Sequence, residues 1–251
     1  MQFPFSFRLF HYEILWHVVV EPLAIFIGFR YYLYFKKKRG DSIESQNRMW
    51  VILGATLGAV VGSRLIGGLE NIPQMLQAPD KWLYFYQNKT VLGGFLGGVV
   101  GVETIKKIIG EKQNSGDLFV YPILLALIIG RIGCFSMGIH EETYGLPTRL
   151  FTGIDLGDGV LRHPVVLYEM FFLMILWMAL WRIEKRYRLT NGLLFKLFII
   201  AYCIFRFMID FIKPHYSLAG LSIIQFTCLA GLLYYLLLFF VNKSVFSVCK
   251  K

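Results

Sequence analysis

Long apolar stretches alternate with short polar connections along nearly the whole chain. A helix needs about 20 mostly apolar residues to cross roughly 30 Å of hydrocarbon. Seven stretches meet this length and predict membrane-spanning helices, at residues 13–35, 50–69, 90–109, 118–138, 164–181, 193–212 and 217–241. The pattern therefore predicts an all-α integral membrane protein in which residues 1–251 form a single polytopic transmembrane domain.

The composition agrees with a membrane class. Hydrophobic residues make up 56% of the chain and charged residues 17%, a more apolar mixture than a soluble domain of this size carries. The net charge of +10 does not indicate nucleic-acid binding, because the basic residues stand in short groups between the apolar stretches. The four cysteines lack metal-ligand or redox spacing, so inert thiols are expected.

The basic residues also predict the orientation in the membrane. The alternate connections between the predicted spans, together with the two terminal segments, hold 16 Lys and Arg residues on one side and 6 on the other. The positive-inside rule places the richer side in the cytoplasm. We therefore expect the N-terminus outside, the C-terminus in the cytoplasm, and the long polar connection at 139–163 on the non-cytoplasmic side. The first stretch ends in Lys36-Lys37-Lys38-Arg39 and shows no cleavage site, which predicts a retained anchor.

Two of the predicted spans carry small residues at every fourth position. The glycines are Gly54, Gly58 and Gly62 in one span and Gly93, Gly97 and Gly101 in the other. This spacing places them on one face of each helix, where they allow neighbouring backbones to approach closely. Helix packing is the expected role of these glycines.

Several arginines lie inside the apolar stretches. An arginine at the centre of a lone membrane helix costs about 2.5–3.5 kcal/mol on insertion scales. Arg64, Arg131 and Arg206 therefore each call for a partner, a water-filled cavity or a function. Arg30 lies nearer the cytoplasmic end of its span, where its side chain is expected to reach the interface.

One predicted span has a polar face. Tyr202, Arg206, Asp210 and Lys213 fall within an arc of about 80° on a helix. Two interpretations remain open. Arg206 and Asp210 form an ion pair that only joins helices, or the polar face lines a cavity that it shares with Arg131.

Three further segments place polar groups at or in the spans. His17 and Glu21 lie one helical turn apart, as a structural pair or a functional one. Glycines flank Arg131 within residues 130–138, close enough for backbone amides to reach an anion. The segment 162–169 opens a span with a proline, and its His163, Tyr168 and Glu169 exceed what a helix start needs.

This set of residues predicts a phosphate site in the membrane. Guanidinium groups stay charged and present several fixed donors, which suits a phosphate in a medium of low dielectric constant. Phospholipid is the phosphate compound of that medium. In a reaction, the arginines would stabilise a departing phosphate while a histidine or carboxylate helps to deprotonate the acceptor.

The motifs resemble those of a known family. The chain carries Gly-Arg-Ile-Gly-Cys-Phe at 130–135 with Tyr-Gly at 144–145, Arg-His-Pro-x-x-Leu-Tyr-Glu at 162–169, and Tyr-x3-Arg-Phe-x2-Asp-Phe-x-Lys at 202–213. In this order they resemble the phosphatidylglycerol–prolipoprotein diacylglyceryl transferases of bacteria. The resemblance covers nearly the whole chain and is weakest before residue 50.

The resemblance implies an activity. A diacylglyceryl group passes from phosphatidylglycerol to the lipobox cysteine thiol of a prolipoprotein signal peptide, and glycerol 1-phosphate is released. It implies an enzyme of the bacterial cytoplasmic (inner) membrane that acts in lipoprotein biosynthesis and needs no metal or soluble cofactor. A free thiol is only a few percent thiolate at neutral pH, so the enzyme has to assist its deprotonation.

The resemblance also implies site residues. Arg131, Arg206 and Tyr202 match family motif positions and are candidate catalytic residues, and His140, His163 and Glu169 are candidates for the proton acceptor. The expected substrate-binding set is Arg131, Gly133, Cys134, Gly138, Gly145, Tyr168, Asp210, Lys213, Arg64, His17 and Glu21. No metal ligand is expected.

The chain departs from the family pattern at a few positions. Leu92 stands where the family usually has a histidine that is often proposed to assist the thiol. Cys134 replaces an asparagine, Asp210 a glutamate and Lys213 an arginine. The alternatives are a related transferase that uses the same phospholipid site with another acceptor, or a membrane transporter or lipid-binding module. Against the last stand the odd number of spans and the lack of an internal repeat.

Overall fold

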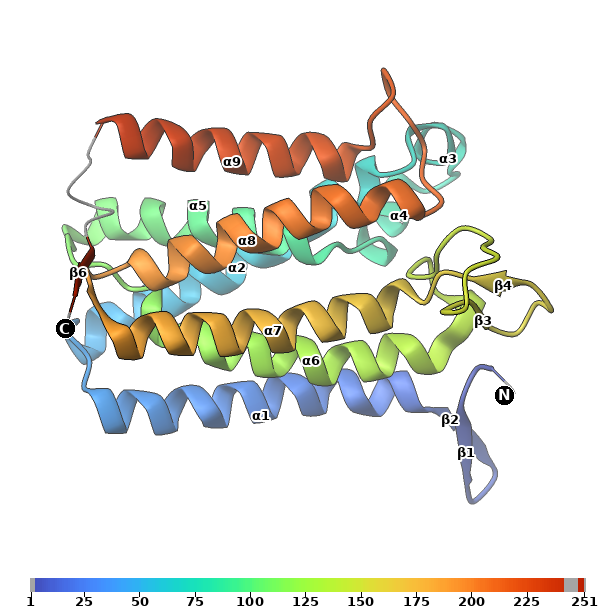
Figure 1. Cartoon of the computed structure of the whole chain (residues 1–251), viewed down its shortest axis with the longest axis horizontal. Coiled ribbons are helices and arrows are strands. Elements are labelled where there is room, and N and C mark those ends of the chain that lie inside the picture. The colour runs from blue at the N-terminus through green and yellow to red at the C-terminus, as the bar shows by residue number, and fades with distance from the viewer. Residues whose placement is uncertain (1–2, 242–247, 251) are drawn as a thin grey trace.

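The computed structural model describes residues 3–241 and 248–250, and most of these residues are helical. Within that part of the chain, seven long helices lie side by side along one direction (Figure 1). They are α1 (Trp16–Arg39), α2 (Ser45–Leu69), α5 (Val91–Ile109), α6 (Val120–Met137), α7 (Val165–Arg186), α8 (Leu193–Ile209) and α9 (Ile223–Val241). The predicted all-α class is confirmed.

Five of the described helices are long and apolar enough to cross a membrane. They are α1, α2, α6 with the short turns that flank it, α7 and α9. Helices α5 and α8 lie in the same bundle but are not among the five, because α5 contains Glu103, Lys106 and Lys107 and α8 has only 17 residues. The five apolar helices support a multi-pass membrane protein.

The glycine-rich faces of α2 and α5 pack directly against each other. A Cβ atom built on Gly58 would lie 2.2 Å from the carbonyl oxygen of Gly97, and one on Gly62 would lie 2.4 Å from that of Gly93. Real side chains do not tolerate such distances, so only glycine permits this approach. The packing role predicted for these glycines is confirmed.

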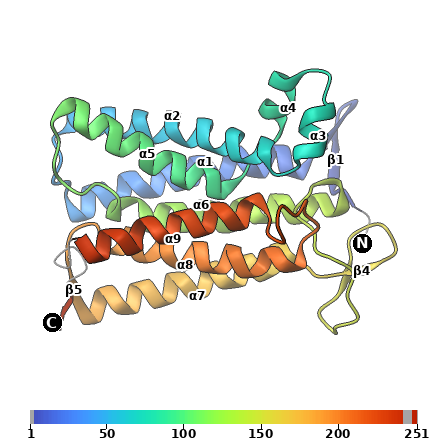
Figure 2. The same cartoon turned by 90° about the horizontal axis from the view of Figure 1, so that it is seen from above.

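Helix α6 packs against α1, α7 and α8, and in the view of Figure 2 it lies between the α2–α5 pair and α7 with α8. On a further side, Gly28 of α1 fits against Ala126 of α6. The apolar core includes the fully buried Leu124, Leu173 and Phe198. This arrangement brings α6, α7 and α8 together at the level of their polar residues.

The two ends of the bundle differ in their connections. At one end lie the hairpin of β1 (Ser6–Leu9) and β2 (Tyr12–Leu15), the short helices α3 (Ile72–Gln77) and α4 (Lys81–Gln87), and the loop between α6 and α7 (Figure 1). That loop contains the turn η2 (Gly138–His140) and the strands β3 (Ile154–Asp155) and β4 (Leu161–Arg162). At the other end lie η1 (Asp117–Phe119) and the pair β5 (Tyr187–Leu189) and β6 (Val248–Lys250).

Some predicted boundaries differ from the structure. Helix α1 begins at Trp16, not at residue 13, because residues 12–15 pair with residues 6–9 as a strand. Helix α9 begins at Ile223, not at 217. Gly220 has a φ of +85°, and the Ser222 hydroxyl accepts a hydrogen bond from the amide of Gln225, which caps the helix there. The short helices α3 and α4 were not predicted.

Candidate active site

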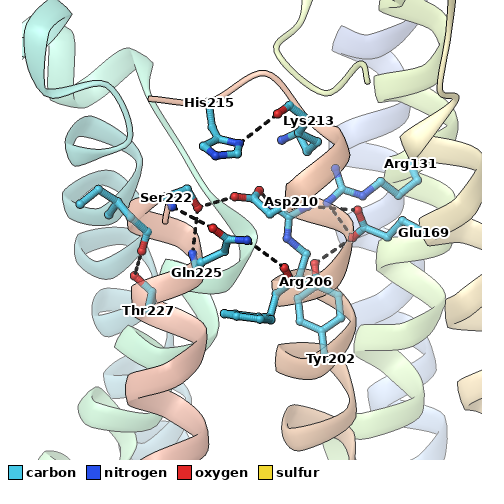
Figure 3. Close-up of polar contacts among 12 residues, drawn as sticks. Arg131, Glu169, Tyr202, Arg206, Asp210, Lys213, His215, Ser222, Gln225 and Thr227 are labelled. Atoms are coloured by element: carbon cyan, nitrogen blue, oxygen red, sulfur yellow. Dashed lines mark hydrogen bonds and ion pairs between the residues drawn. The ribbon is translucent and has the colours of Figure 1, made fainter. Parts of the chain in front are cut away.

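The Glu169 carboxylate lies at the centre of a buried polar cluster (Figure 3). Arg131 Nη2 donates to Glu169 Oε1 at 2.7 Å, and the Tyr202 hydroxyl donates to the same oxygen at 2.8 Å. Arg206 Nη1 lies 3.8 Å from Glu169 Oε2. The side chains of Arg131, Glu169 and Arg206 are 10%, 2% and 8% exposed, so the charges are shielded from solvent.

The four side chains of this cluster come from three helices. Arg131 lies on α6, Glu169 one turn into α7, and Tyr202 and Arg206 one turn apart on α8. Residues four apart lie on the same face of a helix, so both α8 side chains turn toward α7. The Glu169 carboxylate therefore lies between Arg131 on α6 and Arg206 on α8. A cavity shared by the polar face of α8 and Arg131 requires the two arginines to lie close together in this way.

A second carboxylate extends the cluster toward α9. Asp210 opens the turn η3 (Asp210–Ile212), and its Oδ1 lies 3.8 Å from Arg206 Nη2. Its other oxygen accepts a hydrogen bond from the Ser222 hydroxyl. The Gln225 side chain in turn donates to the carbonyl oxygen of Phe207 at 3.2 Å. The predicted Arg206–Asp210 ion pair is thus present, and it is tied to α9.

The cluster has unused hydrogen-bonding capacity. Among the described residues, Arg131 Nε and Asp210 Oδ1 are buried without a hydrogen-bond partner. The 3.8 Å separations of Arg206 from both carboxylates exceed hydrogen-bonding distance. Guanidinium N–H groups of both arginines are therefore available to an anionic ligand.

Lys213 and Glu70 lie at the edge of this cluster. Lys213 follows η3 and is buried, and Glu70 directly follows α2. Burial lowers the pKa of Lys213 and raises the pKa of Glu70, while the attraction between the two charges opposes both shifts. Glu70 was not among the residues predicted from the sequence.

A further group of polar side chains adjoins Arg131 on its other side. Arg131 Nη1 lies 3.6 Å from the sulfur of Cys134. His17 Nδ1 lies 3.5 Å from Glu141 Oε2, and His17 Nε2 lies 3.2 Å from Glu21 Oε2. One ligand atom each of His17, Cys134 and Glu141 lies within 4.8 Å of the other two. These three residue types include the usual ligands of zinc.

The glycines of the predicted site shape the chain rather than supply functional groups. Gly138 has a φ of +58°, and a Cβ atom there would lie 2.3 Å from the carbonyl oxygen of Leu156. A Cβ atom on Gly145 would lie 2.5 Å from the carbonyl oxygen of His163. Gly133 packs against Val20 and His17 with ordinary contacts. The glycines at 138 and 145 thus hold the loop close to the helix ends.

Other predicted residues lie apart from the Glu169 cluster. The Tyr168 hydroxyl forms a hydrogen bond with the Thr152 hydroxyl at 2.7 Å and lies 3.5 Å from His163 Nδ1. These two contacts are separate from the Glu169 cluster. His140 is exposed. The guanidinium of Arg64 lies 4.9 Å from the centre of the Tyr86 ring. The structure does not bring these four residues to the two arginines.

Leu92 occupies the apolar core. Its side chain is completely buried among residues of the hydrophobic cluster that includes Tyr202. No imidazole is present at this position, so a proton acceptor has to come from elsewhere if the site activates a thiol.

Sequence reasoning missed Ser222, Gln225, Glu141 and Lys89. Ser222 and Gln225 form a Ser-x-x-Gln capping pattern, which was a usable signal for the start of α9. Lys89 donates to Glu21 across the end of the bundle, and Glu141 lies in the loop. Nothing in the sequence separates these two from other charged loop residues.

The fold and the cluster define a multi-pass helical membrane protein that holds arginine–carboxylate pairs in its interior. The family model described as prolipoprotein diacylglyceryl transferase matches residues 4–241. The chain therefore belongs to the prolipoprotein diacylglyceryl transferase family.

Curated relatives bear a fuller version of that name, phosphatidylglycerol–prolipoprotein diacylglyceryl transferase. The protein of Campylobacter hominis is 30% identical over 224 residues, which cover 84% of this chain and 78% of the relative. The protein of Campylobacter lari is 28% identical, and the match covers 93% of this chain and 89% of the relative. The protein of Geobacter sulfurreducens is 29% identical, and the match covers 88% of this chain and 87% of the relative.

Proposed function

We propose that this protein transfers the diacylglyceryl group of phosphatidylglycerol to the lipobox cysteine thiol of a prolipoprotein and releases glycerol 1-phosphate. The proposal rests on the position of Arg131 and Arg206 on either side of Glu169, with guanidinium N–H groups that Glu169 does not use. Family membership and the names of the relatives support the same activity.

The charges of the cluster suit a phosphodiester. Arg131, Arg206 and Lys213 oppose Glu169 and Asp210, so these five buried groups sum to one positive charge when all are ionised. Glu70, beside Lys213, lowers the sum to zero when it is ionised as well. A phosphodiester carries one negative charge and would neutralise the positive charge that is left when Glu70 is protonated, the form that its burial favours. Each arginine can offer two parallel donors to phosphate oxygens while Glu169 fixes its position.

The reaction exchanges one bond for another at the glyceryl carbon. The acceptor sulfur forms a bond with that carbon, and the bond from the carbon to the phosphate oxygen breaks with its electrons moving to the oxygen. The leaving glycerol phosphate thereby gains a negative charge, which Arg131 and Arg206 stabilise. The thiol proton leaves with an acceptor group before or during this step.

We also propose roles for the remaining predicted residues in this reaction. Tyr202 holds Glu169, and Asp210 holds Arg206. Tyr168, Lys213, Arg64 and the loop glycines are proposed to contact the lipid or the signal peptide. His140, His163 and Glu169 stay candidates for the proton acceptor, although Glu169 already binds two cations and a hydroxyl.

We further propose the membrane placement. All seven long helices cross the bacterial inner membrane, α5 and α8 included, with the β1–β2 hairpin outside and β6 in the cytoplasm. The charged residues of α8 then face the interior of the bundle and not lipid, as Arg206 does. The loop at 139–163 lies on the outer side, where translocated prolipoproteins arrive.

The test uses purified protein, vesicles containing phosphatidylglycerol and a synthetic lipobox peptide. Mass spectrometry is expected to find the diacylglyceryl increment on the peptide cysteine and glycerol phosphate in the supernatant. A peptide with serine in place of that cysteine is the matched control. Absence of the increment under conditions where a relative is active contradicts the proposal. Release of glycerol phosphate without the peptide product would indicate another acceptor.

A further inference from the structure

We propose that His17, Cys134 and Glu141 bind one zinc ion or a similar divalent transition-metal ion beside the arginine cluster. The three residues come from α1, from α6 and from the loop after α6, and one ligand atom of each lies within 4.8 Å of the others. Nitrogen, sulfur and oxygen ligands are the set that zinc takes in proteins. The family resemblance implies no metal, so this site goes beyond the proposed activity.

The separations are close to those of a coordinated ion. With zinc–ligand bonds of about 2.0–2.3 Å, the ligand atoms of a tetrahedral site lie roughly 3.3–3.6 Å apart. His17 Nδ1 and Glu141 Oε2 are already 3.5 Å apart. The Cys134 sulfur lies no more than 4.8 Å from the other two ligand atoms, so a movement of at most about 1 Å completes the geometry.

The two nearest ligand atoms lack other partners. Among the described residues, His17 Nδ1 and Glu141 Oε2 are buried side-chain atoms without a hydrogen bond. Buried polar atoms are nearly always satisfied, and two unsatisfied atoms that face each other point to a missing third party. A cation between them satisfies both.

The histidine is held as a metal ligand usually is. His17 Nε2 lies 3.2 Å from Glu21 Oε2, and Lys89 donates to the other oxygen of Glu21. A proton on Nε2 that is directed at Glu21 leaves the lone pair of Nδ1 facing Cys134 and Glu141. Such a carboxylate–histidine pair fixes the ring and raises its basicity toward a metal.

The charges also balance. A thiolate from Cys134 and the carboxylate of Glu141 neutralise a divalent ion, and His17 adds no charge. Arg131 Nη1 lies 3.6 Å from the Cys134 sulfur, so the arginine faces the anionic ligand. The other end of the same guanidinium bonds Glu169, which places the metal site directly beside the candidate phosphate site.

Three protein ligands leave a fourth position open. Resting on the proposed function, the acceptor thiol of the prolipoprotein binds there in place of water and loses its proton to solvent, because a coordinated thiol is deprotonated by the ion. Its sulfur then forms the bond with the glyceryl carbon while glycerol phosphate leaves. The zinc keeps its oxidation state, and it supplies the activation that Leu92 does not provide.

Metal binding is tested directly on the full chain after removal of any affinity tag and treatment with a chelator. Titration with zinc is expected to give one equivalent per chain. Cobalt is expected to give a sulfur-to-cobalt charge-transfer band that reports the thiolate. His17→Ala, Cys134→Ser and Glu141→Gln should each remove the tight site, and Glu21→Gln should weaken it by about 10–100-fold.

Two variants serve as matched controls. Glu142→Gln changes the exposed neighbour of Glu141, and Cys203→Ser changes a cysteine outside the cluster. Both should bind zinc and cobalt as the unaltered protein does. Equal metal binding by the unaltered chain and by the His17→Ala/Cys134→Ser/Glu141→Gln triple variant overturns the proposed site.

The activity arm separates this inference from the proposed function. Chelation should reduce peptide diacylglycerylation, and zinc should restore it in the unaltered protein but not in Glu141→Gln. Full activity without metal overturns the activating role while the transferase proposal stands. Tight zinc binding without any transfer product leaves the metal site intact and contradicts the transferase proposal.

Discussion

Glu169 is the residue on which the buried arginines depend. Its carboxylate binds Arg131 and Tyr202 directly and lies 3.8 Å from Arg206, in a site with almost no access to solvent. A buried ion pair adds little net stability, but removal of one partner leaves the other charge uncompensated. The Glu169 side chain therefore both stabilises the cluster and holds the arginines in position to bind an anion.

Glu169→Gln is expected to lower the free energy of unfolding by about 3–5 kcal/mol, because it removes the negative charge that lies between the two guanidinium groups. Thermal and denaturant unfolding in detergent measure the loss. Glu142→Gln on the exposed part of the loop is the control and should change stability very little. Equal effects of the two variants would show that Glu169 is not required for charge balance.

Arg206→Ala is expected to reduce the rate of diacylglyceryl transfer by about 10²–10³-fold or more, since it removes donors aimed at the leaving phosphate. Arg206→Lys should recover part of this rate, because it restores the charge but not the planar fork. Initial rates with the lipobox peptide provide the measurement.

Arg30→Gln is the matched control for Arg206→Ala, because Arg30 lies on α1 with an exposed side chain. It should transfer at the rate of the unaltered protein. An Arg206→Ala variant with full activity would mean that this arginine only joins helices.

The arginines could be predicted from the sequence, and parts of their surroundings could not. Arg131 and Arg206 stand out because charges are rare in apolar stretches. Glu141 and Ser222 lie in loops where polar residues are ordinary, and their roles depend on contacts between distant segments. Contacts of that kind follow from how the helices pack, which periodicity alone does not specify.

At the scale of the elements, α2 and α5 depend on direct backbone contact. Their glycines meet with hypothetical Cβ distances as short as 2.1 Å, at Gly101 against the carbonyl oxygen of Gly54. Membrane helices gain stability from such close packing, since lipid offers no hydrophobic gain for association. The spacing of these glycines predicted a packing face, and the structure adds that the two faces are each other's partners.

Gly97→Ala is expected to destabilise the bundle by forcing α2 and α5 apart, because its Cβ would lie 2.2 Å from the carbonyl oxygen of Gly58. Gly98→Ala is a close control on the next residue of the same helix, where the nearest atom is 3.5 Å away. Thermal unfolding should show a clear loss for the first variant and little change for the second. Similar values for both would contradict the close packing.

Ser222 couples the start of α9 to the active-site helix. It accepts a hydrogen bond from the Gln225 amide and donates one to Asp210, which pairs with Arg206. Ser222→Ala should therefore cost about 0.5–2 kcal/mol as the loss of a helix cap and should also leave Asp210 less well held. Thr227→Ala, within the same helix, should cost less because Thr227 bonds only the carbonyl oxygen one turn earlier.

At the scale of the whole molecule, most of the short elements between the long helices lie at one end of the bundle (Figure 1). The β1–β2 hairpin, α3, α4 and the loop after α6 all lie at that end, whereas β5 and β6 lie at the other (Figure 1). The apolar stretches predicted the seven helices to within a few residues at most ends. The hairpin and the short helices escaped prediction because they are too short for a periodic signal and form through contacts at the bundle end.

The side on which the α6–α7 loop lies depends on whether α5 crosses the membrane. If α5 crosses, Trp82 in α4 and Phe151 in the loop are on the same outer side. If α5 does not cross, the two residues are on opposite sides. Both side chains are highly exposed, at 88% and 98%, so each position suits labelling.

Trp82→Cys and Phe151→Cys, made separately, should both react with an impermeant maleimide in cells whose inner membrane is intact. Lys38→Cys, in the basic end of α1, should react only after permeabilisation. Site-resolved mass spectrometry identifies the labelled cysteine without removal of the natural ones. Labelling of Trp82→Cys but not Phe151→Cys from outside would contradict the seven-pass arrangement, and it would place the loop with its glycines on the side away from arriving prolipoproteins.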